Sequence, residues 1–198
     1  MDFYYENLCR QEGYSILAGM DEVGRGPLAG PVLACALILP DGFDIEGVND
    51  SKKIAPGKRE KLYQAIKDIA LEIGIGLVEA DEIDSINILK ATHKAMAVAL
   101  ANLCTVPDCV LVDGGFVPTI KMPQKAIKGG DAKSISIAAA SIVAKVTRDN
   151  LMLEYHNVYP AYGFNAHKGY GTKQHIQAIK QHGLCPIHRK TFVKEEYL

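Results

Sequence analysis

The sequence lacks the features that mark membrane and secreted proteins. Its 198 residues include five cysteines, an odd number with no CxxC spacing, which argues against a disulfide framework. The longest apolar stretch, residues 27–40, is too short to span a bilayer. Residues 1–6 carry acids where a signal peptide needs positive charge. We therefore expect a soluble, cytoplasmic monomer that makes no contact with membranes.

An excess of one charge is also absent, since the formal net charge is −1. The two parts of the chain nevertheless differ. Residues 1–120 contain 10 Lys/Arg and 18 Asp/Glu, a balance of −8, whereas residues 121–198 contain 12 and 5, a balance of +7. This asymmetry is compatible with a basic surface beside an acidic site. On charge alone, two solvated faces of an ordinary domain are the more common explanation.

No repeat or low-complexity tract is present, and the spacing of apolar residues predicts an alternation of strands and helices. We expect one α/β domain over residues 1–198, with its core from about residue 15, a mixed central sheet flanked by helices, and a small helical extension at the C-terminus. The predicted strands are 16–20, 32–39, 73–77, 109–112 and 125–128, the first two joined as a hairpin. The predicted helices are 58–71, 86–103, 134–158 and 172–182, the last ended by Gly183.

Four acidic residues stand beside predicted elements, where an acid contributes little to folding. Asp21 and Glu22 follow an apolar run, Asp113 ends another before two glycines, and Asp131 follows two glycines and precedes a helix. Strand ends that meet at one edge of a sheet are where α/β proteins build sites. Carboxylates gathered there repel one another unless a cation joins them, and hard oxygen ligands select Mg²⁺ or Mn²⁺. No His or Cys cluster accompanies them, which argues against zinc.

Each acid also has an ordinary structural explanation. Asp131 can be a helix N-cap, Asp113 a turn residue, and the Asp21–Glu22 pair a solvated turn. Neighbouring strand residues point to opposite faces, so Asp21 and Glu22 can share a metal site only where the strand ends or bulges, or where one of them uses its carbonyl oxygen. The three structural explanations become weaker when they are taken together. A cap or a turn does not have to follow an apolar strand, so structural roles alone do not explain why acids stand at these strand ends.

The segment 24–30 is rich in glycine, with the spacing GxGxxxG, and is followed by a strand. A dinucleotide fingerprint requires GxGxxG and a helix, so that interpretation fails. Arg25 between Gly24 and Gly26 instead suits close approach of the backbone to a sugar–phosphate chain. Ser141, Lys145 and Arg148 form one stripe along a predicted helix, for which a solvated face is the usual explanation.

Several segments resemble the ribonuclease HII family when taken in order. The first is Asp21-Glu22-Val23-Gly24-Arg25-Gly26-Pro27-Leu28-Ala29-Gly30-Pro31-Val32. It is followed by Asn49-Asp50-Ser51-Lys52-Lys53, Ile86-Asn87-Ile88-Leu89-Lys90-Ala91-Thr92, Val112-Asp113-Gly114, Gly129-Gly130-Asp131, residues 140–149, His167-Lys168-Gly169-Tyr170-Gly171-Thr172 and His188-Arg189-Lys190-Thr191-Phe192. Gly115-Phe116 and the Arg189-Lys190 pair depart from the pattern, and neither departure touches a carboxylate.

The resemblance implies a ribonuclease H-like fold and an endoribonuclease that uses two divalent ions, Mg²⁺ or Mn²⁺. Its substrates would be RNA–DNA hybrids and duplex DNA that contains single ribonucleotides, cut to leave a 5′-phosphate and a 3′-hydroxyl. The implied metal-binding and catalytic residues are Asp21, Glu22, Asp113 and Asp131. The expected nucleic-acid contacts are Gly24, Arg25, Gly26, Lys52, Ser141, Lys145, Lys168 and Tyr170.

Two other functions remain open at this point. One is a nucleic-acid-binding domain that keeps the fold without cleavage, although the presence of all four carboxylates argues against it. The other is a related nuclease that acts on DNA junctions with the same metal chemistry. Protein partners cannot be inferred from the sequence.

Overall fold

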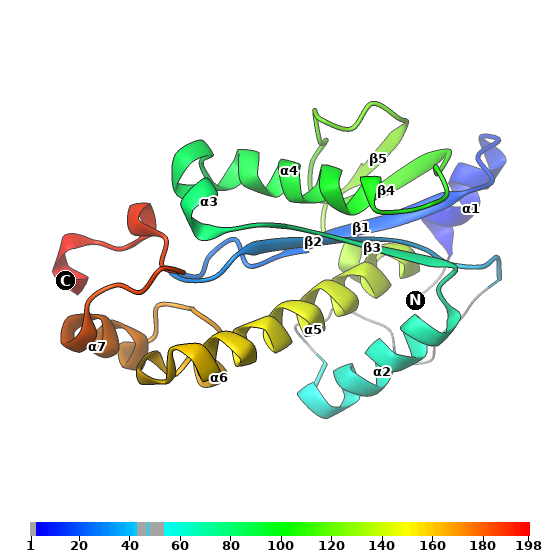
Figure 1. The fold of residues 1–198 in the computed structure, drawn as a ribbon. Helices are drawn as coiled ribbons and strands as arrows, with labels where there is room; N and C mark the ends of the chain where they lie inside the picture. Colours follow the sequence, from blue (N-terminus) through cyan, green and yellow to red (C-terminus); the bar gives the residue numbers. More distant parts are fainter. Residues whose placement is uncertain (1–2, 43–46, 48–53) are drawn as a thin grey trace.

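A five-stranded sheet with helices on both faces forms the centre of the molecule (Figure 1). The computed structural model describes residues 3–42, 47 and 54–198. The strand order is β3-β2-β1-β4-β5, with β1 antiparallel to β2 and parallel to β4, so the sheet is mixed as predicted. The strands are β1 Leu17–Val23, β2 Val32–Ile38, β3 Glu72–Val78, β4 Cys109–Asp113 and β5 Gln124–Ile127.

The helices begin and end at residues whose chemistry explains the boundary. Ser134 caps α5, Asn87 caps α4 and Thr172 caps α7, each through a side-chain oxygen that accepts from backbone N–H groups. The helices are α1 Tyr4–Gln11, α2 Pro56–Ile69, α3 Ala80–Ile86, α4 Ile88–Ala101, α5 Ile135–Val158, α6 Phe164–His167 and α7 Lys173–His182. Short 3₁₀ turns are η1 Gly130–Ala132, η2 Pro160–Tyr162, η3 Lys190–Phe192 and η4 Glu195–Tyr197.

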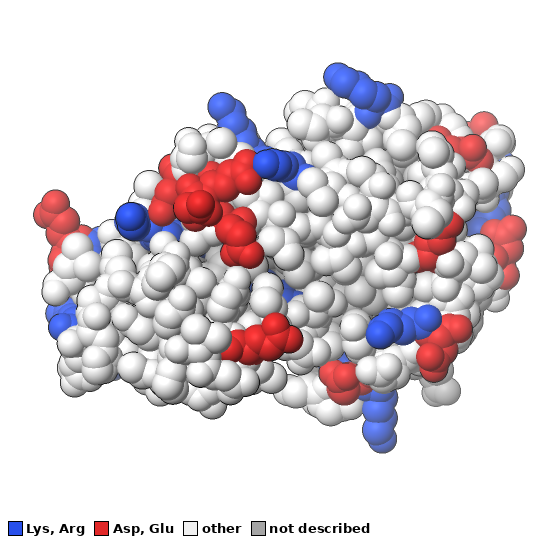
Figure 2. All heavy atoms as spheres, viewed as in Figure 1, with Lys and Arg blue, Asp and Glu red and all other residues white. Residues whose placement is uncertain are grey.

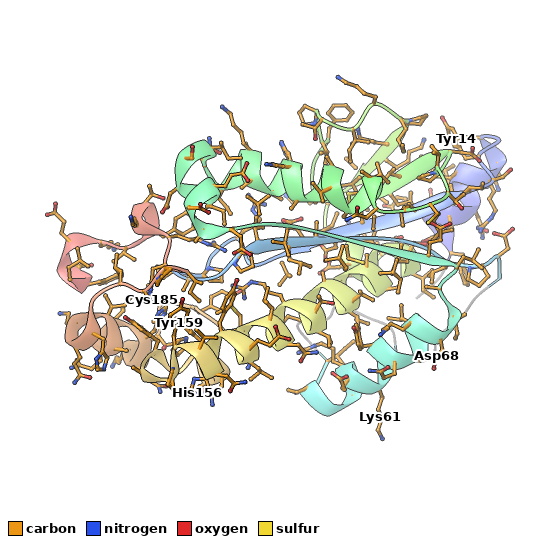
Figure 3. The ribbon with its side chains drawn as sticks, viewed as in Figure 1. Tyr14, Lys61, Asp68, His156, Tyr159 and Cys185 are labelled. Carbon is orange, nitrogen blue, oxygen red and sulfur yellow. The ribbon has the colours of Figure 1, made fainter. Side chains whose placement is uncertain are left out.

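Alternate residues of the strands fill two cores. One face of β1 and β2 packs against α4 through residues such as Met20 and Ala34, and the other packs against α2 and α5 through residues such as Cys35. Side chains occupy the space on both sides of the sheet (Figure 3). The start of α5 crosses β1 so closely that a Cβ at Gly19 would lie 2.2 Å from the carbonyl carbon of Ser136. Any larger residue at position 19 would therefore push α5 off the sheet.

The predicted strands and long helices are confirmed, with boundaries that shift by one to three residues. The prediction missed α1, α3 and the short helix α6. α1 has only eight residues, of which Glu6 and Cys9 are buried, so the segment is too short for its spacing to indicate a helix. The helix predicted over 86–103 is interrupted at Asn87, whose positive φ of 70° separates α3 from α4.

The C-terminal extension packs on the loop between β1 and β2. Ala29, Met152, Phe164, Cys185 and Ile187 belong to one buried cluster at this end of the molecule, where Figure 3 labels Cys185 and Tyr159. Backbone bonds join the same segments, since Gly169 accepts from the N–H of Leu28 and Leu28 accepts from the N–H of Arg189. In the described part of the chain, no helix has the length and apolar character needed to cross a membrane.

Candidate active site

Two carboxylates lie near the end of β1 and, by strand alternation, on opposite faces of the sheet. β1 continues through both residues, with Asp21 opposite Cys35 and Glu22 opposite Ala34 in regular register. The strand therefore neither ends nor bulges at Asp21, which leaves the carbonyl oxygen of one of the two residues as the group through which the pair can share a metal site. Asp21 is 4% exposed on the α5 face, whereas Glu22 borders a cavity beside α4. The ordinary pleat of the strand accounts for this division.

The third and fourth acids come from the neighbouring parallel strand and the turn that precedes α5. Because Met20 pairs with Val112, Asp113 at the end of β4 lies level with Asp21. Asp113 accepts a 2.6 Å hydrogen bond at Oδ1 from the N–H of Gly130, the residue before Asp131. Asp131 is buried in η1, and Ser134, not Asp131, caps α5. The interpretation of Asp131 as the N-cap is thus wrong.

Asp21, Glu22 and Asp113 interact through their charges. Burial raises the pKa of Asp21 well above its ordinary value, and the charges of Glu22 and Asp113 raise it further, while a hydrogen bond with Ser141 opposes them. Burial also raises the pKa of Glu22, against the bond from Arg25, and Asp113 adds to the increase. Asp21 and Glu22 are therefore costly to ionise, because burial and neighbouring like charges both disfavour a carboxylate.

Glu22 and Asp21 accept hydrogen bonds from donors of the protein. Arg25 Nη1 donates to Glu22 Oε1 at 3.2 Å, and the N–H of Glu22 donates to Asp21 Oδ1 at 2.8 Å. Among the described residues, no group of three His, Cys, Asp or Glu side chains is gathered tightly enough to hold a metal ion as it stands. The donor set, hard carboxylate oxygens whose ionisation a nearby cation would favour, nevertheless suits a divalent ion.

A cavity of about 390 Å³ opens beside these acids. Glu22, Arg25 and Asp113 line it on one side, and α4 lines the other with residues that include His93 and the exposed Leu89. Phe116, 63% exposed, stands at its edge. The space is open to solvent at the carboxylates, as a site for a large substrate requires.

A buried arginine holds the loop that follows β1. Arg189 has no exposed surface, and its guanidinium donates to the carbonyls of Gly24 at 2.6 Å, Arg25 at 3.0 Å and Gly30 at 2.9 Å. Burial, together with the charge of Arg148, lowers the pKa of Arg189 to about 9. The segment 24–30 is therefore a fixed loop clamped by a cation from the far end of the chain.

We expect Arg189→Met to destabilise the fold strongly, because three buried carbonyls lose their donor. The usual cost of such unsatisfied groups predicts a fall of about 3 kcal/mol in the free energy of unfolding, measured by urea denaturation. Lys190→Met is the matched control, since the neighbouring Lys190 is exposed, and it should change this free energy by less than about 0.5 kcal/mol. Equal effects from the two variants would show that the clamp does not stabilise the loop.

Arg148 acts on the same region from α5. Its side chain is fully buried and donates to the carbonyls of Pro31 at 3.0 Å, Lys168 at 3.0 Å and Ala29 at 3.2 Å. Ser141, on the same helix, is only 4% exposed. The solvated stripe considered for Ser141, Lys145 and Arg148 is therefore wrong, because two of its three members face the interior.

Tyr170 lies over the loop that Arg189 clamps. A Cβ at Gly26 would lie 3.7 Å from Cε1 of Tyr170, and the tyrosine is 43% exposed. The preceding Lys168 and Gly169 have positive φ angles of 51° and 86°. A side chain at position 169 would meet the carbonyl oxygen of Ala29 at 2.4 Å, so only glycine allows this turn to approach the loop.

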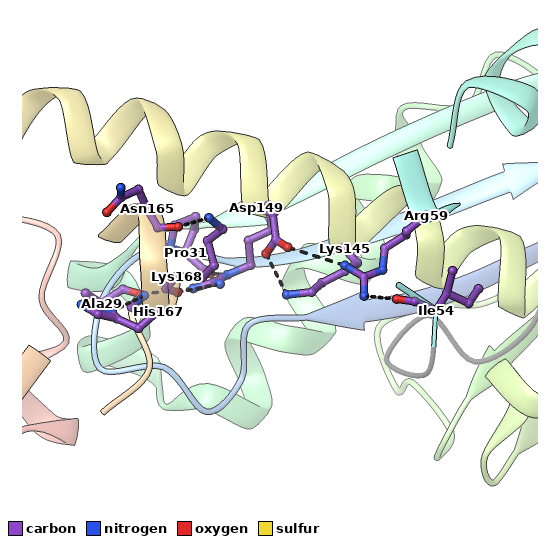
Figure 4. A network of polar contacts seen from close by, with 11 residues as sticks. Ala29, Pro31, Ile54, Arg59, Lys145, Asp149, Asn165, His167 and Lys168 are labelled. Carbon is purple, nitrogen blue, oxygen red and sulfur yellow. Dashed lines mark hydrogen bonds and ion pairs between the residues drawn. The ribbon is translucent and has the colours of Figure 1, made fainter. Parts of the chain in front are cut away.

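The three lysines that were predicted to contact nucleic acid differ in their surroundings. Lys145 pairs with Asp149 at 2.7 Å, which also approaches Arg59 at 4.0 Å (Figure 4). The ammonium of Lys168 donates to the carbonyl of Asn165. Lys52 lies outside the described residues. Lys145 and Lys168 are thus within one polar network along α5 and α6, and both already have acceptors.

The face shown in Figure 2 carries no continuous basic surface among the described residues. Lys and Arg stand singly there, and acidic side chains gather over α3, whose first turn contains Asp81 and Glu82. The positive charge of the C-terminal part is in part internal, since Arg148 and Arg189 are buried.

Comparison with known proteins shows the family of this chain. The family model for ribonuclease HII matches residues 18–197. The chain belongs to the ribonuclease HII family. It is 56% identical over 190 residues to ribonuclease HII of Acetivibrio thermocellus, an alignment that covers 96% of this chain and 74% of that protein. Members of the ribonuclease HII family are metal-dependent endoribonucleases, and so is this chain.

Solved structures confirm the ribonuclease H-like fold. The ribonuclease H2 of Pyrococcus horikoshii superposes with a TM-score of 0.74 at 32% identity, covering 89% of this chain and 93% of that one. Bst-RNase HIII, solved in complex with Mn²⁺, has a TM-score of 0.72 at 16% identity, covering 95% and 70%. The second likeness concerns the fold alone.

Proposed function

We propose that this ribonuclease HII cuts its substrate with Asp21, Glu22, Asp113 and Asp131 as the metal-binding group. The chain cleaves the RNA strand of RNA–DNA hybrids and excises ribonucleotides embedded in DNA. The observation that carries the residue assignment is the placement of Asp21, Glu22 and Asp113 at the ends of parallel β1 and β4, with the turn that contains Asp131 bonded to Asp113 through the N–H of Gly130. Acids so placed give no folding advantage, because burial and like charges raise the cost of ionising Asp21 and Glu22.

The four acids would hold two divalent ions, Mg²⁺ or Mn²⁺. When bound, such ions supply an activated water and stabilise charge on the leaving 3′-oxygen. Asp21 is kept in place by Ser141 and by the N–H of Glu22, and Asp113 is kept in place by Gly130. Ser141 therefore serves the site by orienting a carboxylate, rather than by touching the duplex. No nucleophilic side chain is required, and the products carry a 5′-phosphate and a 3′-hydroxyl.

The loop from Gly24 to Gly26 would receive the sugar–phosphate chain at the cut. Arg25 is half exposed at its side chain and can move from Glu22 to a phosphate when a cation neutralises the acid. Beneath the loop, Arg148 and Arg189 donate to backbone carbonyls, which carry no net charge. The positive charge of the two guanidinium groups therefore favours an anion at the surface of the loop. Tyr170 would contact the ribose, since a hydroxyl donor within reach of the 2′-OH can distinguish RNA from DNA.

We expect Lys145→Ala and Lys168→Ala to lower the dependence of duplex affinity on salt. Each lost phosphate contact should reduce the slope of log K against log salt by roughly 0.9, measured by fluorescence anisotropy in EDTA so that the duplex is not cut. Lys61→Ala, on the exposed side of α2, is the control and should leave the slope unchanged. Slopes equal to wild type for both test variants would mean that these lysines serve only Asp149 and Asn165.

A single assay tests the proposed function against the two other possibilities. An end-labelled duplex with one embedded ribonucleotide is incubated with Mg²⁺, with Mn²⁺ or with EDTA, beside an all-DNA duplex and a DNA junction. We expect one cut at the ribonucleotide, only with metal, and none in the all-DNA duplex. Binding without cleavage would support the non-catalytic domain, and cleavage of the junction alone would support the junction nuclease.

A further inference from the structure

A line of buried histidines lies behind Tyr170, outside the group of carboxylates. His167, His175 and His188 are 8%, 0% and 2% exposed, and they come from α6, α7 and the C-terminal loop. The rings of His167 and His175 stack at 4.4 Å with an interplanar angle of 16°. Burying three imidazoles is costly unless their nitrogens are bonded, so the use of each nitrogen is informative.

The hydrogen bonds determine which nitrogen of each ring carries the proton. His175 Nδ1 lies 3.0 Å from the carbonyl oxygen of Tyr170, which can only accept, so Nδ1 donates. In the neutral ring His175 Nε2 must then accept, and its partner at 3.1 Å is His188 Nε2, which therefore donates. His188 Nδ1 in turn accepts from the N–H of Cys185 at 2.9 Å. The bonds run in one direction and end on the Tyr170 backbone.

His167 holds the same turn from the other side. Its Nδ1 accepts from the N–H of Gly169 at 3.2 Å, and its Nε2 donates to the carbonyl of Tyr162 at 2.8 Å. Burial lowers the pKa of all three rings, that of His175 to about 4, which keeps them neutral as this pattern requires. The backbone on either side of the Tyr170 N–H is therefore held by imidazoles in addition to its own turn, in which the Tyr170 carbonyl accepts from the N–H of Thr172 at 2.8 Å and the Tyr170 N–H donates to the carbonyl of His167 at 2.9 Å.

We propose that His175, supported by His188, is a positioning residue that fixes the Tyr170 backbone and so holds the Tyr170 ring over Gly26 for the ribonucleotide. The inference rests on the proposed contact between Tyr170 and the substrate. One ring nitrogen of His175 donates to the carbonyl of Tyr170 and the other bonds to His188, so His175 reaches the substrate only through Tyr170. A shift of about 1 Å in a substrate-contacting group can lower the rate by up to two orders of magnitude. Residues that fix the position of the Tyr170 ring can therefore affect the rate.

Two matched substitutions separate positioning from packing. His175→Asn places an amide nitrogen where Nδ1 lies and can keep the bond to the Tyr170 carbonyl, whereas His175→Gln places its amide near Nε2 and can keep only the bond to His188. Each variant loses one buried hydrogen bond, so both should show similar thermal unfolding. Steady-state cleavage of a duplex with one embedded ribonucleotide is measured for both, well above the ordinary pKa of imidazole, with kcat and KM determined separately.

We expect His175→Gln to lower kcat/KM roughly tenfold and His175→Asn to stay within roughly threefold of wild type. In a Tyr170→Ala background, His175→Gln should have no further effect, because the group that it positions is gone. Equal kcat/KM for the Asn and Gln variants, or a tenfold loss from His175→Gln in both backgrounds, would overturn the positioning role while leaving Tyr170 in place. Wild-type cleavage by Tyr170→Ala alone would instead refute the proposed contact of Tyr170, and this inference with it.

Discussion

Replacing Asp113 by Asn is expected to lower cleavage by orders of magnitude while the chain stays folded. The change removes one of the three coupled negative charges that would balance the divalent ions. The Asn side-chain oxygen can still accept from the N–H of Gly130, so the turn before α5 keeps its bond. Removing a like charge from a crowded group should leave the free energy of unfolding unchanged or raised. Steady-state cleavage and thermal unfolding of the same preparation measure both effects.

Asp108→Asn is the control for this experiment. Asp108 stands just before β4, at the opposite end of the strand from Asp113, and its carboxylate accepts from the N–H groups of Ser15 and Ile16. The substitution should leave cleavage at the wild-type rate. We expect Asp21→Asn and Asp131→Asn to behave as Asp113→Asn does. If Asp113→Asn cleaved as well as Asp108→Asn, the assignment of the metal-binding group would be wrong.

Tyr170→Ala should cost far more in cleavage of a single embedded ribonucleotide than in folding stability. The ring is 43% exposed and lies against Gly26, so its removal leaves no large cavity in the core. Loss of the contact with the sugar should lower kcat/KM roughly a hundredfold, by analogy with the cost of a misplaced substrate. Cleavage is compared with urea unfolding, where the change should stay near the ordinary surface range of about 0.5 kcal/mol.

Tyr170→Phe separates packing from hydrogen bonding, because it keeps the ring and removes only the hydroxyl. An effect near that of Tyr170→Ala would assign the recognition to the hydroxyl, and a mild effect would assign it to the ring. Tyr4→Ala, at an exposed tyrosine on α1, is the control and should cut normally. A folded Tyr170→Ala enzyme that cuts at the wild-type rate would exclude Tyr170 from substrate recognition.

Much of the architecture could be predicted because hydrophobic spacing is local. β2 is buried at every position and α5 combines a capping serine with a long apolar face, so both segments indicate their structure without the rest of the fold. α1 could not be recognised in the same way, because its stability comes from a few distant contacts. Glu6 on α1 accepts from Ser134 and Ser136 at the start of α5, more than 100 residues away.

The acids of the site could also be predicted from the sequence, because each stands next to an apolar strand or a glycine pair. The buried residues that hold the site in place could not be predicted. Arg148 and Arg189 belong to a residue type that is almost always exposed, and their acceptors are carbonyls 20 to 165 residues away. Backbone carbonyls have no sequence signature, so only the folded chain shows which side chains donate to them. The histidines behind Tyr170 could not be predicted for the same reason, because they too bond to backbone groups.

Direct measurement of metal binding tests the central claim, that the carboxylates at the ends of β1 and β4 form the metal site. Mn²⁺ is titrated into the full chain and into Asp113→Asn and Asp108→Asn by isothermal titration calorimetry. We expect wild type and Asp108→Asn to bind Mn²⁺ alike, and Asp113→Asn to bind at least roughly tenfold more weakly because a charged ligand is gone. Equal affinity and stoichiometry in all three proteins would contradict the claim.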